Sequence, residues 1–119
     1  MNEPACFELT DKTMPISNLH NVNGNLVEHR LLHSLYGYYS SMHTHKALLN
    51  RSQERPFILT RSFYAGTQKH AAIWSGDSSC DWENFYKCIP ILLQKSLAGL
   101  SFVGGDVPGF YGNPCLLDG

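Results

Sequence analysis

Charged residues follow three short apolar runs of this sequence: Arg61, Asp77 and Asp106. If the runs are parallel strands, their carboxyl ends meet on one face, which is where (β/α)₈ barrels carry out their chemistry. A carboxyl group on that face can act as a general acid and base, and an arginine there can form charge-assisted hydrogen bonds with a substrate. Each residue also has an ordinary interpretation, because Asp77 and Asp106 suit turns and Arg61 suits a surface salt bridge.

The apolar runs predict short buried strands at 57–60, 71–74 and 100–103. A helix over 31–49 is predicted before the first strand, because its apolar side chains recur at helical spacing. The order helix, strand, strand, helix and strand is typical of an α/β fold with a parallel sheet covered by helices. A whole (β/α)₈ barrel needs ~250 residues. The 119 residues, with about three strands, therefore predict a partial (β/α)₈ TIM barrel.

The second predicted helix follows Asp81, whose carboxylate suits the N-cap position. Pro90 lacks a backbone N–H and is predicted to kink or restart this helix. Gly99 suits the position just past the end of the helix.

Residues 1–30 are polar and are predicted to form a long irregular loop. Pro4, Pro15 and the asparagine-rich run 18–25 carry this prediction. A loop of this length inside a compact domain is usually functional.

The composition is that of a globular protein, with 43% hydrophobic and 16% charged residues. The net charge of −1 comes with no basic stripe, which argues against a nucleic-acid partner. No apolar run approaches the ~20 residues that a membrane span needs. The cysteines include no Cys-x-x-Cys pair and are predicted to be free thiols. They are Cys6, Cys80, Cys88 and Cys115.

Two histidine pairs could suggest a metal site, namely His29 with His33 and His43 with His45. His29 and His33 have the spacing of two ligands on one helix face, but the His-Glu-x-x-His motif is absent. His43 and His45 would point to different sides of a helix. No phosphate-binding glycine motif is present either, so neither a metal nor another cofactor is predicted.

Four segments of the sequence resemble motifs of one enzyme family. They are Met-Asn-Glu-Pro at 1–4, Arg-Pro-Phe-Ile-Leu-Thr-Arg-Ser-Phe-Tyr-Ala-Gly at 55–66, Ile-Trp-Ser-Gly-Asp at 73–77, and Gly-Leu-Ser-Phe-Val-Gly-Gly-Asp-Val at 99–107 with Gly109-Phe110. Their order and spacing are similar to those of glycoside hydrolase family 31, which contains retaining α-glucosidases. The resemblance extends over nearly the whole chain and implies that residues 1–119 belong to the family's catalytic barrel, with 1–30 as an active-site loop region.

The resemblance also implies site residues. Asp77 corresponds to the family's general acid/base, and the family's nucleophile would be the residue before Met1. Glu3 belongs to the catalytic set in a supporting role. Retaining glycosidases place their two carboxyl groups about 5–5.5 Å apart. The implied sugar-binding residues are Arg61, Trp74, Asp106 and Phe110. The Trp74 ring could also shield Asp77 from water and so raise its pKa, as an acid/base requires.

Two segments look nearest to the neutral branch of the family, which includes glucosidase II: Val27–Arg30 and Leu35–Gly37. This similarity implies an oligosaccharide substrate, the lumen of the endoplasmic reticulum and a noncatalytic β subunit as a partner. Ser78 and Gly105 depart from residues frequent in the family, asparagine and alanine respectively. Two alternatives to an enzyme stay open: a catalytically dead relative that binds glycans, and a gene-model fragment.

Overall fold

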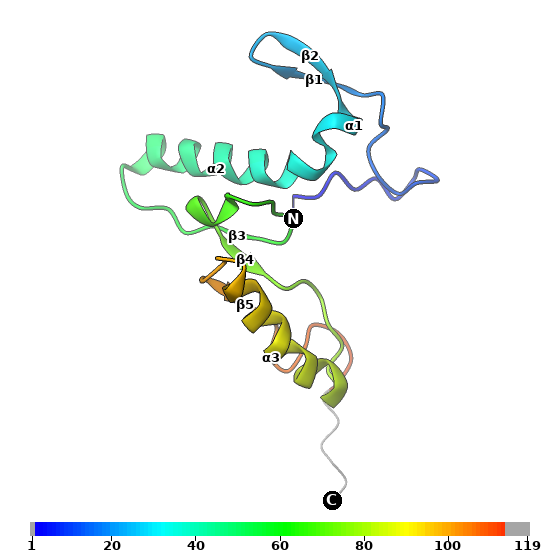
Figure 1. Cartoon of the computed structure of the whole chain (residues 1–119), viewed down its shortest axis with the longest axis vertical. Helices are drawn as coiled ribbons and strands as arrows, with labels where there is room; N and C mark the ends of the chain where they lie inside the picture. Colours follow the sequence, from blue (N-terminus) through cyan, green and yellow to red (C-terminus); the bar gives the residue numbers. More distant parts are fainter. Residues whose placement is uncertain (1, 114–119) are drawn as a thin grey trace, which may run out of the picture.

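The computed structural model describes residues 2–113, so Met1, Cys115 and the rest of 114–119 lie outside the described residues. An N-terminal hairpin is followed by a helical segment, two strands, a long helix and a last strand (Figure 1). This is the element order expected from the sequence after residue 30. The elements are β1 (Leu19–Val22), β2 (Asn25–Glu28), α1 (His29–Leu32), η1 (His33–Leu35), α2 (Tyr36–Ser52), β3 (Leu59–Thr60), η2 (Thr67–Lys69), β4 (Ala72–Trp74), α3 (Trp82–Leu97) and β5 (Val103–Gly104).

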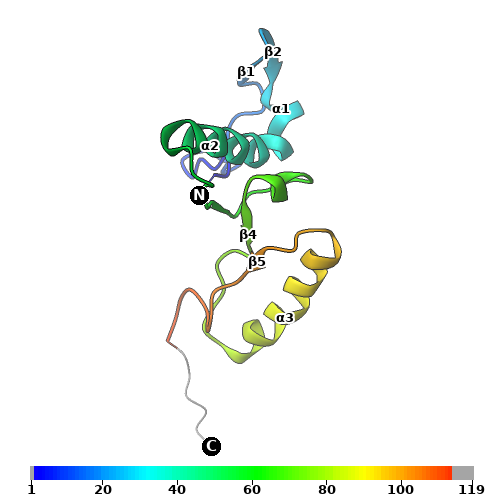
Figure 2. The ribbon, with the colours of Figure 1, turned by 90° about the vertical axis from the view of Figure 1, so that its left-hand side faces the viewer.

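The three predicted strands form a parallel sheet in the order β3-β4-β5. Leu59 pairs with Ala72, and Ile73 pairs with Val103. Each strand is shorter than predicted, but each ends close to where the sequence placed its end. In both views of the chain, α2 lies on one side of these strands and α3 on the other (Figures 1 and 2).

The predicted loop over 1–30 is wrong at 19–28, where β1 and β2 pair as an antiparallel hairpin. Asn23 and Gly24 both have positive φ, 52° and 87°, as a two-residue hairpin turn requires. Asn-Gly is the strongest short-range hairpin signal, because both residues tolerate this left-handed backbone. The prediction missed this signal because the whole asparagine-rich run 18–25 was interpreted as a loop.

Both predicted helices are confirmed, and one feature of the second is corrected. The Asp81 carboxylate accepts the N–H of Asn84 at 2.7 Å and caps α3. After the helix, Gly99 takes a φ of 84°, and the N–H of Leu100 reaches the carbonyl of Lys95 at 3.0 Å. Pro90 lies inside α3 without ending it. Only the bond from residue 90 to the carbonyl of Tyr86 is lost, and Tyr86 is exposed, so water can satisfy that carbonyl.

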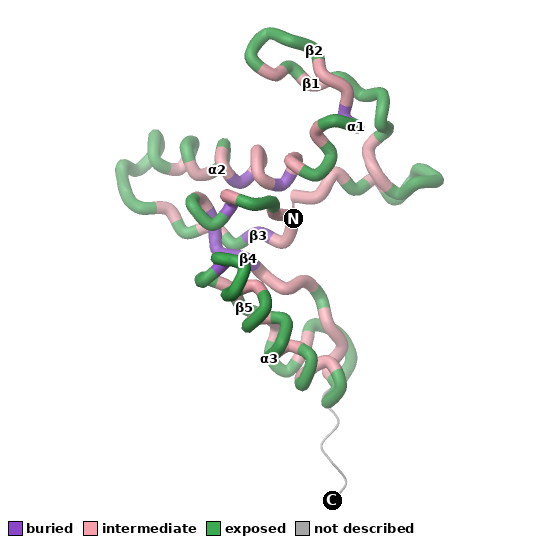
Figure 3. The backbone as a smooth tube through the Cα atoms, in the orientation of Figure 1, coloured by how far each residue is buried: buried purple, intermediate pink, exposed green. Residues whose placement is uncertain are grey.

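Little of the chain is buried (Figure 3). The buried apolar side chains lie around β4 and at the end of α3: Ala71, Ala72, Ile73 and Leu100. The radius of gyration is 17.3 Å, whereas a compact chain of this length has about 13.5 Å. Phe57 and Phe102 pack edge to face at 6.0 Å, yet they are 70% and 68% exposed. The sheet therefore presents an uncovered apolar surface.

No helix within residues 2–113 has the length and apolar character needed to cross a membrane.

Candidate active site

Arg61 joins two carboxylates at the carboxyl end of the sheet. It directly follows β3, and its Nε donates to Oε1 of Glu3 at 2.5 Å. Its Nη1 approaches Oδ1 of Asp77, beyond the end of β4, at 3.4 Å. The three side chains are half-buried: 32% of the surface is exposed for Arg61, 27% for Glu3 and 36% for Asp77. Residues far apart in sequence thus meet where the sequence predicted a functional face.

The ion pair fixes the charges of two of these groups. The Arg61 guanidinium, by its hydrogen bond, holds the pKa of the Glu3 carboxyl below its usual range. The Glu3 carboxylate in turn raises the pKa of Arg61. Glu3 is therefore an anion at neutral pH and has no proton to donate. This is consistent with a supporting role for Glu3 and leaves proton transfer to another carboxyl group.

Trp74 and Asp106 lie beside this ion pair. The indole N–H of Trp74 donates to Oδ1 of Asp106 at 3.1 Å. The second oxygen of that carboxylate, Oδ2, is buried and accepts no hydrogen bond from any residue within 2–113. The Arg61 guanidinium lies over the Trp74 ring, 5.4 Å from its centre. We call Glu3, Arg61, Trp74, Asp77 and Asp106 together the strand-end cluster.

A glycine before Asp77 permits this arrangement. Gly76 has a φ of 92°, a conformation that side chains with a Cβ rarely adopt. A Cβ built at this position would stand 3.5 Å from Cδ of Arg61. The Gly76 turn thus brings Asp77 back toward Arg61.

Phe110 is the remaining predicted site residue. It is 63% exposed. Its backbone N–H donates to the carbonyl of Ser78 at 2.7 Å, so its segment is anchored next to Asp77. The Trp74 ring contacts Arg61 and Asp106, and its shielding of Asp77 stays a prediction.

Sequence reasoning missed Asn2, although it lies inside the Met-Asn-Glu-Pro motif. Its side-chain amide bonds the backbone of Ser62 and the carbonyl of Gly37. Its place inside that motif, directly before Glu3, was the available signal.

A second polar group connects strand β1 of the hairpin with α1 and η1. Nε2 of His20 is 2.9 Å from Nδ1 of His29, and Nε2 of His29 is 2.9 Å from Nδ1 of His33. We call these residues the histidine chain. The sequence had singled out His29 and His33 but not His20. The two ring nitrogens of the fully buried His29 bond different neighbours, so the three rings do not converge on one point. Within 2–113, no group of three or more His, Cys, Asp or Glu side chains could hold a metal ion.

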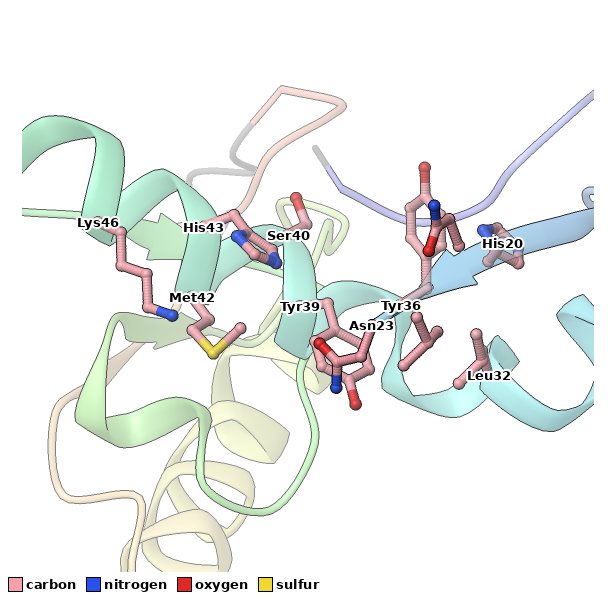
Figure 4. A pocket seen from close by; sticks show the side chains of 11 residues that line it. His20, Asn23, Leu32, Tyr36, Tyr39, Ser40, Met42, His43 and Lys46 are labelled. Carbon is pink, nitrogen blue, oxygen red and sulfur yellow. The ribbon is translucent and has the colours of Figure 1, made fainter. Parts of the chain in front are cut away.

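Two cavities border these groups. One of about 680 Å³ lies between the hairpin and α2 and is lined by His20, Tyr36, Tyr39, His43 and Lys46, among others (Figure 4). The other, of about 550 Å³, is bordered by Glu3, His33 and Ser62. Asp77 lines neither of these two cavities. Cys6, Cys80 and Cys88 are free thiols, as predicted, while Cys115 lies outside the described residues.

Comparison with known proteins gives a consistent result. Residues 1–117 match the family described as "Glycosyl hydrolases family 31 TIM-barrel domain". The chain is 48% identical over 116 residues to the human protein "Neutral alpha-glucosidase C", covering 96% of this chain and 12% of that protein.

Solved structures agree with the sequence match. The glucosidase II alpha subunit bound to Glc1Man2 superposes with a TM-score of 0.86 at 46% identity, over 96% of this chain and 12% of that one. The ER glucosidase II heterodimeric complex, of the catalytic subunit and the binding domain of the regulatory subunit, matches equally well, with a TM-score of 0.86, 46% identity and the same coverage of 96% and 12%. The chain thus spans about an eighth of the length of these relatives. It belongs to glycosyl hydrolase family 31, within the TIM-barrel domain of that family.

Proposed function

We propose that this chain forms part of the catalytic barrel of a retaining α-glucosidase that removes terminal α-linked glucose from oligosaccharides. The observation that carries the proposal is the strand-end cluster, in which Arg61 bridges Glu3 and Asp77 beside Trp74 and Asp106. A complete enzyme of the relatives' length would close the barrel over the apolar surface around Phe57 and Phe102.

Asp77 is the general acid/base in this proposal. The nucleophile is the residue that precedes Met1 in the complete enzyme, and it attacks the anomeric carbon of the terminal glucose. Asp77 first gives its proton to the departing glycosidic oxygen and then removes a proton from the water that hydrolyses the glycosyl-enzyme intermediate. Two successive displacements at the anomeric carbon retain its configuration.

Three other cluster residues, Arg61, Trp74 and Asp106, bind the sugar. Oδ2 of Asp106 is buried without a partner in the described part of the chain, and a buried carboxylate oxygen gains from a hydroxyl donor. The Trp74 N–H holds the other oxygen and fixes the orientation of that carboxylate. Arg61 contributes charge-assisted hydrogen bonds, Phe110 lines the sugar site, and Glu3 keeps the arginine in place.

The partner and the compartment are proposed from the same relatives. One solved relative is an ER heterodimer of a catalytic and a regulatory subunit. We extend this to the complete enzyme as a proposal: it works in the endoplasmic reticulum lumen with a noncatalytic subunit.

The test begins with the transcript upstream of the codon for Met1. If an aspartate codon precedes Met1, the complete enzyme is expressed and assayed on 4-nitrophenyl α-glucoside, with the anomer of the released glucose followed by NMR. Hydrolysis with retention supports the proposal. Any other residue there, or inversion, refutes the double-displacement mechanism. An intact aspartate without hydrolysis favours the glycan-binding, catalytically dead alternative.

The role of Asp77 is tested in the same enzyme. Asp77→Asn should lower kcat by about two or more orders of magnitude, since general acids typically contribute 10²–10⁴-fold. Asp11→Asn, at an exposed aspartate of the N-terminal segment, is the matched control and should change kcat little. Wild-type turnover in Asp77→Asn would remove Asp77 from the mechanism.

A further inference from the structure

Asn2 lies at the junction of three segments that build the strand-end cluster. Its neighbour along the chain is Glu3, and Ser62 is the neighbour of Arg61. The Oδ1 atom of Asn2 accepts the N–H of Ser62 at 3.2 Å, and its Nδ2 donates to the carbonyl of Ser62 at 3.2 Å. One side-chain amide thus pairs with both polar groups of a single backbone residue.

The same amide reaches α2. Nδ2 of Asn2 is 3.2 Å from the carbonyl of Gly37 and 3.4 Å from Oγ of the buried Ser41. At this point α2 lies directly on the backbone of Ser62, because a Cβ on Gly37 would stand 2.5 Å from the Ser62 carbonyl oxygen. Thr60 adds a further bond, from its Oγ1 to that carbonyl at 2.8 Å.

This geometry constrains Arg61 from both sides. Thr60 and Ser62, the residues on either side of it, are held by hydrogen bonds, while the guanidinium is drawn to Glu3. Because Asn2 and Glu3 are adjacent, the amide that fixes Ser62 also fixes the segment that presents the partner carboxylate. Only a group with both a donor and an acceptor can do this, which an asparagine amide provides.

We infer that Asn2 is a positioning residue that acts through Arg61, by locking the Ser62 backbone so that the guanidinium meets Glu3 and Asp77. This inference rests on the proposed function for its activity readout. It assigns no contact between Asn2 and the substrate.

The experiment is a double-mutant cycle in the complete enzyme with Asn2→Ala and Arg61→Met. Asn2→Ala should lower kcat/KM for 4-nitrophenyl α-glucoside by about tenfold or more, because the hydrogen bonds that hold the Ser62 backbone are lost. In the Arg61→Met background, Asn2→Ala should have little further effect, because its effect passes through that arginine. Additive losses would show that Asn2 acts independently of Arg61 and would overturn the inference.

Hydrogen exchange gives a readout that does not depend on activity. The peptide that contains the Ser62 amide should exchange faster in Asn2→Ala than in wild type, whereas Asn50→Ala, at an exposed residue of α2, should leave it unchanged. Unchanged exchange at Ser62 would overturn the inference, whether or not the enzyme is active. A lack of α-glucoside hydrolysis would refute only the proposed function. If Asn2→Ala does not fold, the isosteric Asn2→Asp takes its place. It keeps the acceptor, loses the donor, and should show the same non-additivity with Arg61→Met.

Discussion

The strand-end cluster and the histidine chain are both polar groups, but the fold builds them in opposite ways. The strand-end cluster collects residues from position 3 to position 106 at the carboxyl end of a sheet, and its ion pair remains partly exposed. The histidine chain spans only 20–33, and its centre, His29, is fully buried. One group is assembled by long-range strand pairing, whereas the other is assembled by a hairpin and the helical turn that follows it.

The two groups differ in their capacity to bind a further ligand. The charged side chains at the strand ends are partly exposed, and the buried Oδ2 of Asp106 accepts no hydrogen bond within residues 2–113. His29 already uses both ring nitrogens on His20 and His33, so it has none left for a ligand. The first group suits chemistry, while the second suits stabilisation of the hairpin against α1.

After the loss of Asp77, the largest effect is expected from breaking the strand-end cluster at its centre, Arg61. Arg61→Met in the complete enzyme should lower kcat/KM by about 10- to 100-fold or more, because a hydrogen bond to a charged group contributes about 1.5–3 kcal/mol. The initial rate of α-glucoside hydrolysis measures this. Arg51→Met, on the exposed end of α2, is the control and should have wild-type activity. Equal activity of the two variants would separate the cluster from catalysis.

A smaller effect is expected at the contact between α2 and the segment after β3. A Cβ on Gly37 would stand 2.6 Å from the carbonyl carbon of Ser62, so Gly37→Ala must displace backbone. Overpacking of this kind costs about 1–3 kcal/mol. Hydrogen exchange in α2 should accelerate accordingly, by about 5- to 150-fold. Gly104→Ala provides the matched control, since nothing lies within 4 Å of a Cβ there. Similar exchange in both variants would contradict the close approach.

The smallest effect is expected from the histidine chain. Burial, together with the neighbouring His33 and His20, lowers the pKa of His29 from its ordinary value near 6.5. A lowered histidine pKa stabilises the folded state above the ordinary value, and that stability is lost as the pH falls below 6.5 toward the folded pKa. Protection of the hairpin amides, corrected for intrinsic exchange rates, should therefore be lower at pH 5.5 than at pH 7.5.

The variant His29→Gln should remove most of this pH dependence, whereas the exposed His43→Gln should retain it. A pH dependence that survives His29→Gln would assign it to another group.

Much of the local structure could be predicted because its causes are local. Asp81 caps α3 and Gly99 ends it, as the residue types indicated. The order and parallel pairing of the strands followed from apolar runs that alternate with helices. The hairpin was missed only because the Asn23-Gly24 turn signal was not separated from its polar surroundings. Pro90 does not restart the helix, because α3 tolerates the loss of one solvent-facing hydrogen bond.

The sequence by itself determined the family, the positions of the strand ends and the residue types that stand there. Only the tertiary structure decided which of those residues meet. Pairing of β3 with β4 sets the 3.4 Å approach of Arg61 to Asp77, and pairing of β4 with β5 sets the bond from Trp74 to Asp106. Glu3 and Asn2 join them because α2 packs on Ser62, a contact between residues that no sequence periodicity connects. Periodicity fixes which face a side chain takes within its own element, whereas distances between elements depend on the packing of the whole chain.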